Sequence, residues 1–157
     1  GYRDALRHSP DAEAQIVEPC PDWGLDSGRR AAERLMGTTP RPTAIFAQSD
    51  LLALGAISAL RAHGLRVPDD VSIVGFDDIP VAQVFDPPLT TLRQPMREVG
   101  ALAARLVAEP RTDTRRAPAS RRHVLRAPLI VRGSVARIRP EGDRQPIKAR
   151  TKRAPRT

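Results

Sequence analysis

The stretch VSIVGFDD (residues 71–78) constrains the fold more than any other part of this chain. Its side chains are apolar on both alternating faces, apart from Ser72 and Gly75. A strand that is apolar on both faces belongs in the middle of a parallel sheet, where helices cover it on each side. Because the run stops on Asp77 and Asp78, it predicts a central strand that brings carboxylates to one edge of the sheet.

Short apolar runs alternate with helical patterns along the rest of the chain, which is typical of an α/β fold with a parallel sheet in three layers. We expect strands at 14–17, 44–47 and 71–76, and one or two more within 123–134. We expect helices at 2–7, from a cap at Asp26 or Ser27 to Met36, from about Asp50 to Gly64, and at 95–108, with one or two helical turns within 79–85. An extended crossing is expected at 86–95 and a loop at 109–122.

The positive charge of the chain is concentrated at one end. The formal net charge is +8, but residues 136–157 contain eight Lys/Arg and two acidic residues, so they account for most of it. This basic tail has three prolines and almost no apolar periodicity, and we expect it to be disordered. A nonspecific contact with nucleic acid remains an alternative to a solvated tail.

Several classes of protein are not supported by the sequence. Cys20 is the only cysteine, so no intrachain disulfide forms, and no Cys/His cluster has the spacing of a zinc site. No metal or cofactor is therefore expected. No apolar stretch approaches the ~20 residues that span a bilayer, so we expect no membrane partner and a cytoplasmic location. Gly1 is not a natural initiator, which suggests a processed chain or a fragment.

Polar or aromatic side chains follow three of the expected strands. Trp23 lies in the loop after the first, Ser49 and Asp50 follow the second, and Asp77 ends the third. Ligands of open parallel sheets bind at this carboxyl edge. Carboxylates accept hydrogen bonds from hydroxyls and amines, and an indole stacks on the apolar face of a sugar or base, so a small polar ligand is predicted.

Catalysis is not predicted at this edge. The three histidines, His8, His63 and His123, are expected to lie away from it. The sequence has no serine elbow, lysine nucleophile or metal cluster, and no glycine-rich phosphate loop follows a strand, which argues against a Rossmann-type enzyme.

Structural roles compete with ligand contact for each candidate. Asp50 stands where a helix N-cap belongs, Asp77 could cap the short helix that follows it, and Asp78 is expected to do so. Trp23 could simply cover the edge of the sheet. The helix at 51–60 is expected to be mainly core, but its excess of apolar residues leaves room for a contact with a second subunit.

Longer phrases carry a family resemblance. PTAIFAQSDLLALGAISALRAHGLRVPDDVSIVGFDD followed by PPLTTLRQP resembles the effector-binding domain of LacI/GalR-family transcription regulators, as do GYRDAL, DWGLDSG and APLIVRGS. The resemblance implies a periplasmic-binding-protein-like (type I) fold with two α/β lobes around a ligand cleft, a homodimer, and operator binding through an N-terminal helix-turn-helix. It covers roughly residues 1–134 and implies that most of one lobe and the DNA-binding headpiece are missing. We therefore expect residues 1–135 to form the effector-binding and dimerisation domain.

The resemblance also assigns roles to individual residues. It implies that Trp23 stacks on an effector, such as a sugar, and that Asp77 accepts its hydroxyls or amines. Asp50 lies in the family's Asn-Asp pair, where Ser49 replaces the usual Asn and shortens a polar arm. Gln94 and Met96 fall at a crossing near the cleft. The positions matching the family's dimer interface are Leu54, Ile57 and Phe85.

Two further expectations follow from the same resemblance. The helix at 95–108 belongs to the incomplete lobe, so its apolar face, made by Met96, Val99, Ala103, Leu106 and Val107, is expected to be loosely packed or folded back. A periplasmic sugar-binding protein of an ABC transporter has the same fold and is the alternative function, although VPDDVSIVGFDD with PPLTT is more typical of the regulators.

Overall fold

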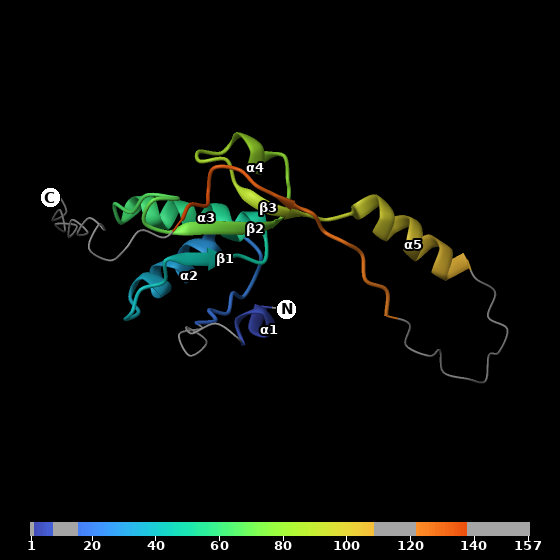
Figure 1. The fold of residues 1–157 in the computed structure, drawn as a ribbon, viewed down its shortest axis with the longest axis horizontal. Helices are drawn as coiled ribbons and strands as arrows, with labels where there is room; N and C mark the ends of the chain where they lie inside the picture. Colours follow the sequence, from blue (N-terminus) through green and yellow to red (C-terminus); the bar gives the residue numbers. More distant parts are fainter. Residues whose placement is uncertain (1, 8–15, 109–121, 138–157) are drawn as a thin grey trace, which may run out of the picture.

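The computed structural model describes residues 2–7, 16–108 and 122–137 (Figure 1). Four expectations fall wholly or partly on other residues: the position of His8, the strand at 14–17, the loop at 109–122 and the basic tail at 136–157. Ile16 and Val17, the described half of that strand, are not in a strand. The first helix, α1, is Tyr2–Leu6.

The sheet contains β1 (Ala44–Phe46), β2 (Ser72–Asp77), β3 (Thr90–Arg93) and β4 (Leu129–Ile130), in the order β1-β2-β3-β4. The central position of β2 is confirmed, and it pairs in parallel with β1 and β3. β4 pairs antiparallel with β3, so the sheet is mixed rather than fully parallel. The reason is that the chain leaves the sheet after β3 and returns in the opposite direction (Figure 1).

Two helices pack closely against each other, α2 (Leu25–Met36) and α3 (Asp50–Ala62). Small residues allow this approach. A Cβ added to Gly28 would lie 2.2 Å from the Leu52 carbonyl oxygen, and one added to Gly55 would lie 1.9 Å from that of Leu25. Backbone therefore meets backbone at this crossing, and only glycine fits at either position.

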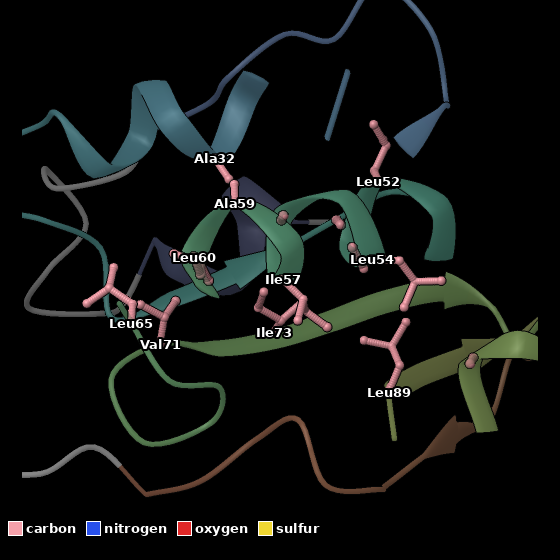
Figure 2. Packing of buried hydrophobic residues seen from close by; sticks show 14 residues of the cluster. Ala32, Leu52, Leu54, Ile57, Ala59, Leu60, Leu65, Val71, Ile73 and Leu89 are labelled. Atoms are coloured by element: carbon pink, nitrogen blue, oxygen red, sulfur yellow. The ribbon is translucent and has the colours of Figure 1, made fainter. Parts of the chain in front are cut away.

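The core lies between α3 and the sheet (Figure 2). Nine of the thirteen residues of α3 are buried, which explains why its apolar residues occur on more than one face: α2 covers one side and β2 the other. Ile57 and Leu60 of α3 pack in one cluster with Ile73 of β2 and Leu89. Aliphatic residues make up this cluster, in agreement with a chain that is 3% aromatic.

Of the three expected layers, the described residues show the sheet and one layer of helices, on the side where α3 packs. In β2, Ile73 and Gly75 are buried on the α3 side, whereas Ser72, Val74 and Phe76 on the alternate positions are only partly buried. β1 was expected to be a buried strand, but it is the edge of the described sheet, and Phe46 remains 44% exposed there.

The remaining helices are α4 (Val81–Val84), which confirms the short helix after β2, and α5 (Met96–Ala108). No residue of α5 is buried. Gln94 and Pro95 lead from β3 into α5, and residues 122–128 form an extended segment that leads into β4 (Figure 1). This arrangement agrees with the loosely packed alternative for this helix rather than with the folded-back one.

The start of α2 differs from the prediction. Its N-cap is Gly24 rather than Asp26 or Ser27, and no side chain caps it. The side chain of Asp22 instead accepts a hydrogen bond from the Gly24 N–H at 2.8 Å. Asp26 lies within the first turn and pairs with Arg29 and Arg30 on the exposed face.

Candidate functional site

Asp77 and Gln94 meet at the carboxyl edge of the central strands. Asp77 is the last residue of β2 and Gln94 directly follows β3, so the parallel pairing brings them together. The Gln94 side-chain amide donates to Asp77 Oδ1, and the Gln94 backbone N–H lies 3.4 Å from the Asp77 carbonyl oxygen. No hydrogen bond to Asp77 Oδ2 forms within the described residues, and both side chains are partly exposed. One carboxylate oxygen thus stays available to a donor from outside.

Trp23 lies in the loop before α2 and is 60% exposed. An indole that merely covered a sheet edge would be buried by it, so this exposure favours a role in contact with another molecule. Its backbone carbonyl accepts a hydrogen bond from the Ser49 hydroxyl at 3.2 Å. The loop that carries the aromatic ring is therefore tied to the start of α3.

Ser49 is the N-cap of α3 and is buried. Its hydroxyl accepts the Leu52 N–H at 3.1 Å while it donates to Trp23. These two bonds use its only proton and one of its lone pairs, so Ser49 supports the site rather than reaching into it. This position was predicted to contact the effector, and the structure leaves its side chain almost no exposed surface.

Asp50 was expected either to contact the effector or to cap α3, but it is the first residue of α3 and is completely buried. Its Oδ1 accepts the Thr91 hydroxyl at 2.5 Å, and its Oδ2 accepts the Ile79 N–H at 2.9 Å. Burial raises the pKa of Asp50, and the hydrogen bonds from Thr91 and Ile79 only partly offset this effect. The carboxylate thus joins α3, β3 and the turn after β2 beneath the site.

Gly75 leaves the space that Asp50 occupies. A Cβ at residue 75 would lie 2.3 Å from Asp50 Oδ1 and 2.9 Å from Leu89 Cδ2. The glycine in the apolar run of β2 is therefore required by the buried carboxylate that packs against it. The sequence pattern did not reveal this contact.

Asp78 was expected to cap α4, but it binds two arginines. Its Oδ2 accepts from Arg93 Nε and its Oδ1 from Arg132 Nη2, both at 2.6 Å. Burial alone would raise the pKa of Asp78, but the hydrogen bonds from Arg132 and Arg93 outweigh it, so the pKa is lowered. Both acids have positive φ, 124° for Asp77 and 60° for Asp78, so these contacts hold a constrained turn.

A groove of about 390 Å³ lies between α5 and the segment that returns to the sheet. Gln94 and His123 both line it, so His123 is closer to the crossing than expected. The α5 residues that line it are Val99, Leu102, Ala103 and Leu106. Met96, a predicted effector contact, does not line this groove and is 65% exposed.

The residues predicted at a dimer interface lie in different environments. Leu54 and Ile57 are buried within the single chain, at 3% and 0% exposure, which leaves almost no side-chain surface for a second subunit. This disagrees with the expectation, because the strands and loops of the same chain already cover that face of α3. Phe85 is partly buried, and the Arg61 guanidinium lies 5.9 Å from its ring centre.

The exposed side chains at this edge are suited to hydrogen bonding and stacking. In the ranges 2–7, 16–108 and 122–137, no group of three or more His, Cys, Asp or Glu could hold a metal ion. No helix in the same ranges is long and apolar enough to cross a membrane. The exposed groups are an indole, a carboxylate oxygen and an amide, which suit a ligand with hydroxyl donors and an apolar face.

Comparison with known proteins agrees with this geometry. A family model described as a periplasmic binding protein-like domain matches residues 1–135. The HTH-type transcriptional repressor CytR of Escherichia coli (strain K12) is 41% identical over 138 residues, which are 85% of this chain and 39% of that protein. This chain therefore spans less than half the length of that relative.

Solved structures of transcription regulators are also similar. The complex of the regulator CelR with cellobiose has 39% identity and a TM-score of 0.69, covering 85% of this chain and 40% of that one. A LacI family transcriptional regulator from Enterococcus faecium with bound ribose has 27% identity and a TM-score of 0.68, covering 88% and 50%. All three relatives are transcription regulators by name, which favours the regulator over the transporter alternative.

Proposed function

Because this chain belongs to the periplasmic binding protein-like domain family, in the form found in LacI-family transcription regulators, we propose that it is the ligand-sensing part of such a regulator. It binds a small polyhydroxylated molecule, such as a sugar, and acts by binding rather than by catalysis. The helix-turn-helix of the complete regulator binds operator DNA, and the protein works in the cytoplasm, where that DNA is.

The observation that carries this proposal is the position of Asp77. Its carboxylate stands at the end of the central strand β2, with Gln94 bonded to Oδ1 and with Oδ2 open to a ligand. The exposed ring of Trp23, tied to α3 through Ser49, supplies an apolar platform. Ser49 and Asp50 support the site from beneath, and Met96 lies at the crossing beside Gln94.

Dimerisation is the second part of the proposal. Phe85 follows α4, where Val84 is 82% exposed and Val81 is 39% exposed. These neighbouring apolar side chains suit a contact with a second copy of the chain. Leu54 and Ile57 contribute to that contact by packing beneath this surface rather than by touching the other copy.

Trp23 makes the ligand proposal testable, because it is the only tryptophan. Titration with cellobiose and with ribose, followed by tryptophan emission, should give a saturable change for at least one of them. Asp77→Asn should weaken that binding about 10- to 100-fold, since hydrogen bonds to a charged group contribute ~1.5–3 kcal/mol. Asparagine keeps an acceptor for Gln94 and tolerates positive φ, so the fold should survive.

The matched control is Asp86→Asn, which changes a carboxylate whose side chain is 92% exposed. It should bind the sugar as the wild-type chain does. If neither sugar gives a saturable signal, or if Asp77→Asn and Asp86→Asn bind equally well, the assignment of this site is wrong.

A further inference from the structure

Two segments connect α5 to the rest of the molecule, and both pass Asp78. One leaves the sheet through Arg93 at the end of β3, and the other returns through β4 to Arg132 (Figure 1). We infer that Asp78 clamps these two crossings together and that, by fixing Arg93, it positions Gln94 against Asp77 for ligand binding. The second half of this inference rests on the proposed function.

Each oxygen of Asp78 holds a different crossing. Arg93 Nε donates to Oδ2 and Arg132 Nη2 donates to Oδ1, both at 2.6 Å. The Asp78 side chain is 2% exposed and that of Arg132 is 14% exposed. Removal of one partner from the buried Asp78–Arg132 pair would leave an uncompensated charge, so breaking this pair should be more destabilising than breaking a surface pair.

Arg132 is itself held in place by β3. Its Nη1 donates to the Leu89 carbonyl oxygen at 2.8 Å, and its backbone N–H donates to the Thr90 hydroxyl oxygen at 2.8 Å. The guanidinium is therefore oriented toward Asp78 before the ion pair forms. A fixed donor on one crossing makes Asp78 an anchor for the more exposed Arg93 on the other.

The peptide bond between Arg93 and Gln94 links the clamp directly to the ligand site. Arg93 stands opposite Asp77 in the β2–β3 register, and the next residue, Gln94, bonds to Asp77 through both its side chain and its backbone. Asp78 is too buried to contact a ligand itself. It is a positioning residue, and its loss should free Arg93 and, with it, Gln94.

Hydrogen exchange of the 157-residue chain tests the clamp without any ligand. Two backbone amides report on the crossings: Arg93 N–H, which donates to the Pro128 carbonyl at 2.9 Å, and Arg132 N–H. Asp78→Asn should accelerate exchange of both by about tenfold or more, while amides of α3 change by less than about threefold. Asparagine tolerates the positive φ of residue 78, so the turn can persist. Asp86→Asn, which alters the exposed pair with Arg61, should leave both amides unchanged.

Arg93→Gln provides a milder variant because Arg93 is 54% exposed. It should accelerate hydrogen exchange of the backbone amide at position 93 and leave the Arg132 amide protected, since the Asp78–Arg132 pair remains. Equal acceleration of the crossing and α3 amides in Asp78→Asn, or no acceleration at either crossing, would overturn the clamp.

Sugar titration tests the positioning half. Where cellobiose or ribose saturates the wild-type signal, Asp78→Asn should raise the Kd about tenfold, and Asp78→Glu should recover part of this loss. Unchanged affinity together with faster crossing amides would overturn the positioning role. A wild-type chain that binds neither sugar would overturn the proposed function, while the exchange pattern would still decide whether the clamp exists.

Discussion

Ser49 and Trp23 are 26 positions apart in the sequence, and the hydroxyl of the first donates a hydrogen bond to the backbone carbonyl of the second. The same hydroxyl accepts the Leu52 N–H and so caps α3. One small buried side chain therefore fixes both the start of the core helix and the loop that presents the aromatic ring. The serine stands where the family resemblance implies an asparagine, and its short side chain makes both internal bonds.

Ser49→Ala should destabilise the protein and loosen the Trp23 loop. Loss of an N-cap typically lowers the free energy of unfolding by ~1 kcal/mol. Urea unfolding should show this loss, and the fluorescence anisotropy of Trp23 should fall in the folded state. Ser58→Ala is the control, because Ser58 lies exposed on the same helix. Equal stability and anisotropy in the two variants would show that the tie has no effect.

Gly75→Ala should be destabilising because the new methyl group would overlap the buried carboxylate of Asp50. Overpacking of this kind costs ~1–3 kcal/mol of the free energy of unfolding. Gly100→Ala, in α5, is the matched control, since a Cβ there would meet no atom within 4 Å. Alanine at an exposed helical position should stabilise α5 by up to ~1 kcal/mol. If the free energy of unfolding changed in the same direction in both variants, the packing argument would be contradicted.

The pH dependence of stability should reveal the buried state of Asp50. Burial raises its pKa above the ordinary value of 3.8, so the folded protein binds this proton more tightly than the unfolded chain does. The carboxyl therefore contributes most to stability at acid pH, and this contribution decreases as the pH rises from the ordinary to the raised pKa. The stability of the wild type minus that of Asp50→Asn should fall over this range in urea unfolding. A difference that rises with pH would contradict the burial effect.

Asp78 should show the opposite slope. Its pKa is lowered from 3.8 because the bonds from Arg132 and Arg93 outweigh burial, so its contribution is complete above the ordinary value and is lost as the pH falls through the lowered pKa. The stability of the wild type minus that of Asp78→Asn should therefore rise with pH in the acid range. If the stability difference between wild type and variant changed with pH in the same direction for both aspartates, either the burial effect on Asp50 or the ion-pair effect on Asp78 would be contradicted.

The helix α5 should exchange its amides much faster than α3. No residue of α5 is buried, whereas α3 lies between α2 and the sheet. Local opening costs little where few apolar contacts must be broken. Hydrogen exchange followed by mass spectrometry of peptides from the two helices provides the measurement. Protection of α5 equal to that of α3 would show that its apolar side is covered in solution.

The elements that the sequence predicts well are those with strong local signals. The apolar run of β2, the glycine after the α3 pattern and the proline before α5 each indicate a boundary that the structure reproduces within a few residues. The roles of the aspartates could not be predicted this way. Asp50 bonds to Thr91, 41 positions later, and Asp78 to Arg132, 54 positions later. Such contacts depend on the register of the strands, which no local pattern contains.

The local sequence pattern also could not show what covers the apolar residues of α3. A helix with apolar residues on several faces can be covered by its own chain or by a second subunit, and both give the same spacing. The glycines decided the outcome here, because Gly28 and Gly55 allow α2 to lie directly on α3. Two glycines in neighbouring helices are a signal for close packing that the sequence does contain.

The contact of backbone with backbone at Gly28 and Gly55 also has a mechanical consequence. Helices separated by long side chains can slide past each other as rotamers change. At this crossing no side chain separates the two backbones. The loop of Trp23 enters α2 only two residues ahead of Leu25, whose carbonyl faces Gly55. The backbone of the Trp23 loop is therefore tied to α3 in two places, at this helix crossing and at the Ser49 hydroxyl, so that a displacement of the loop should be passed on to the core helix.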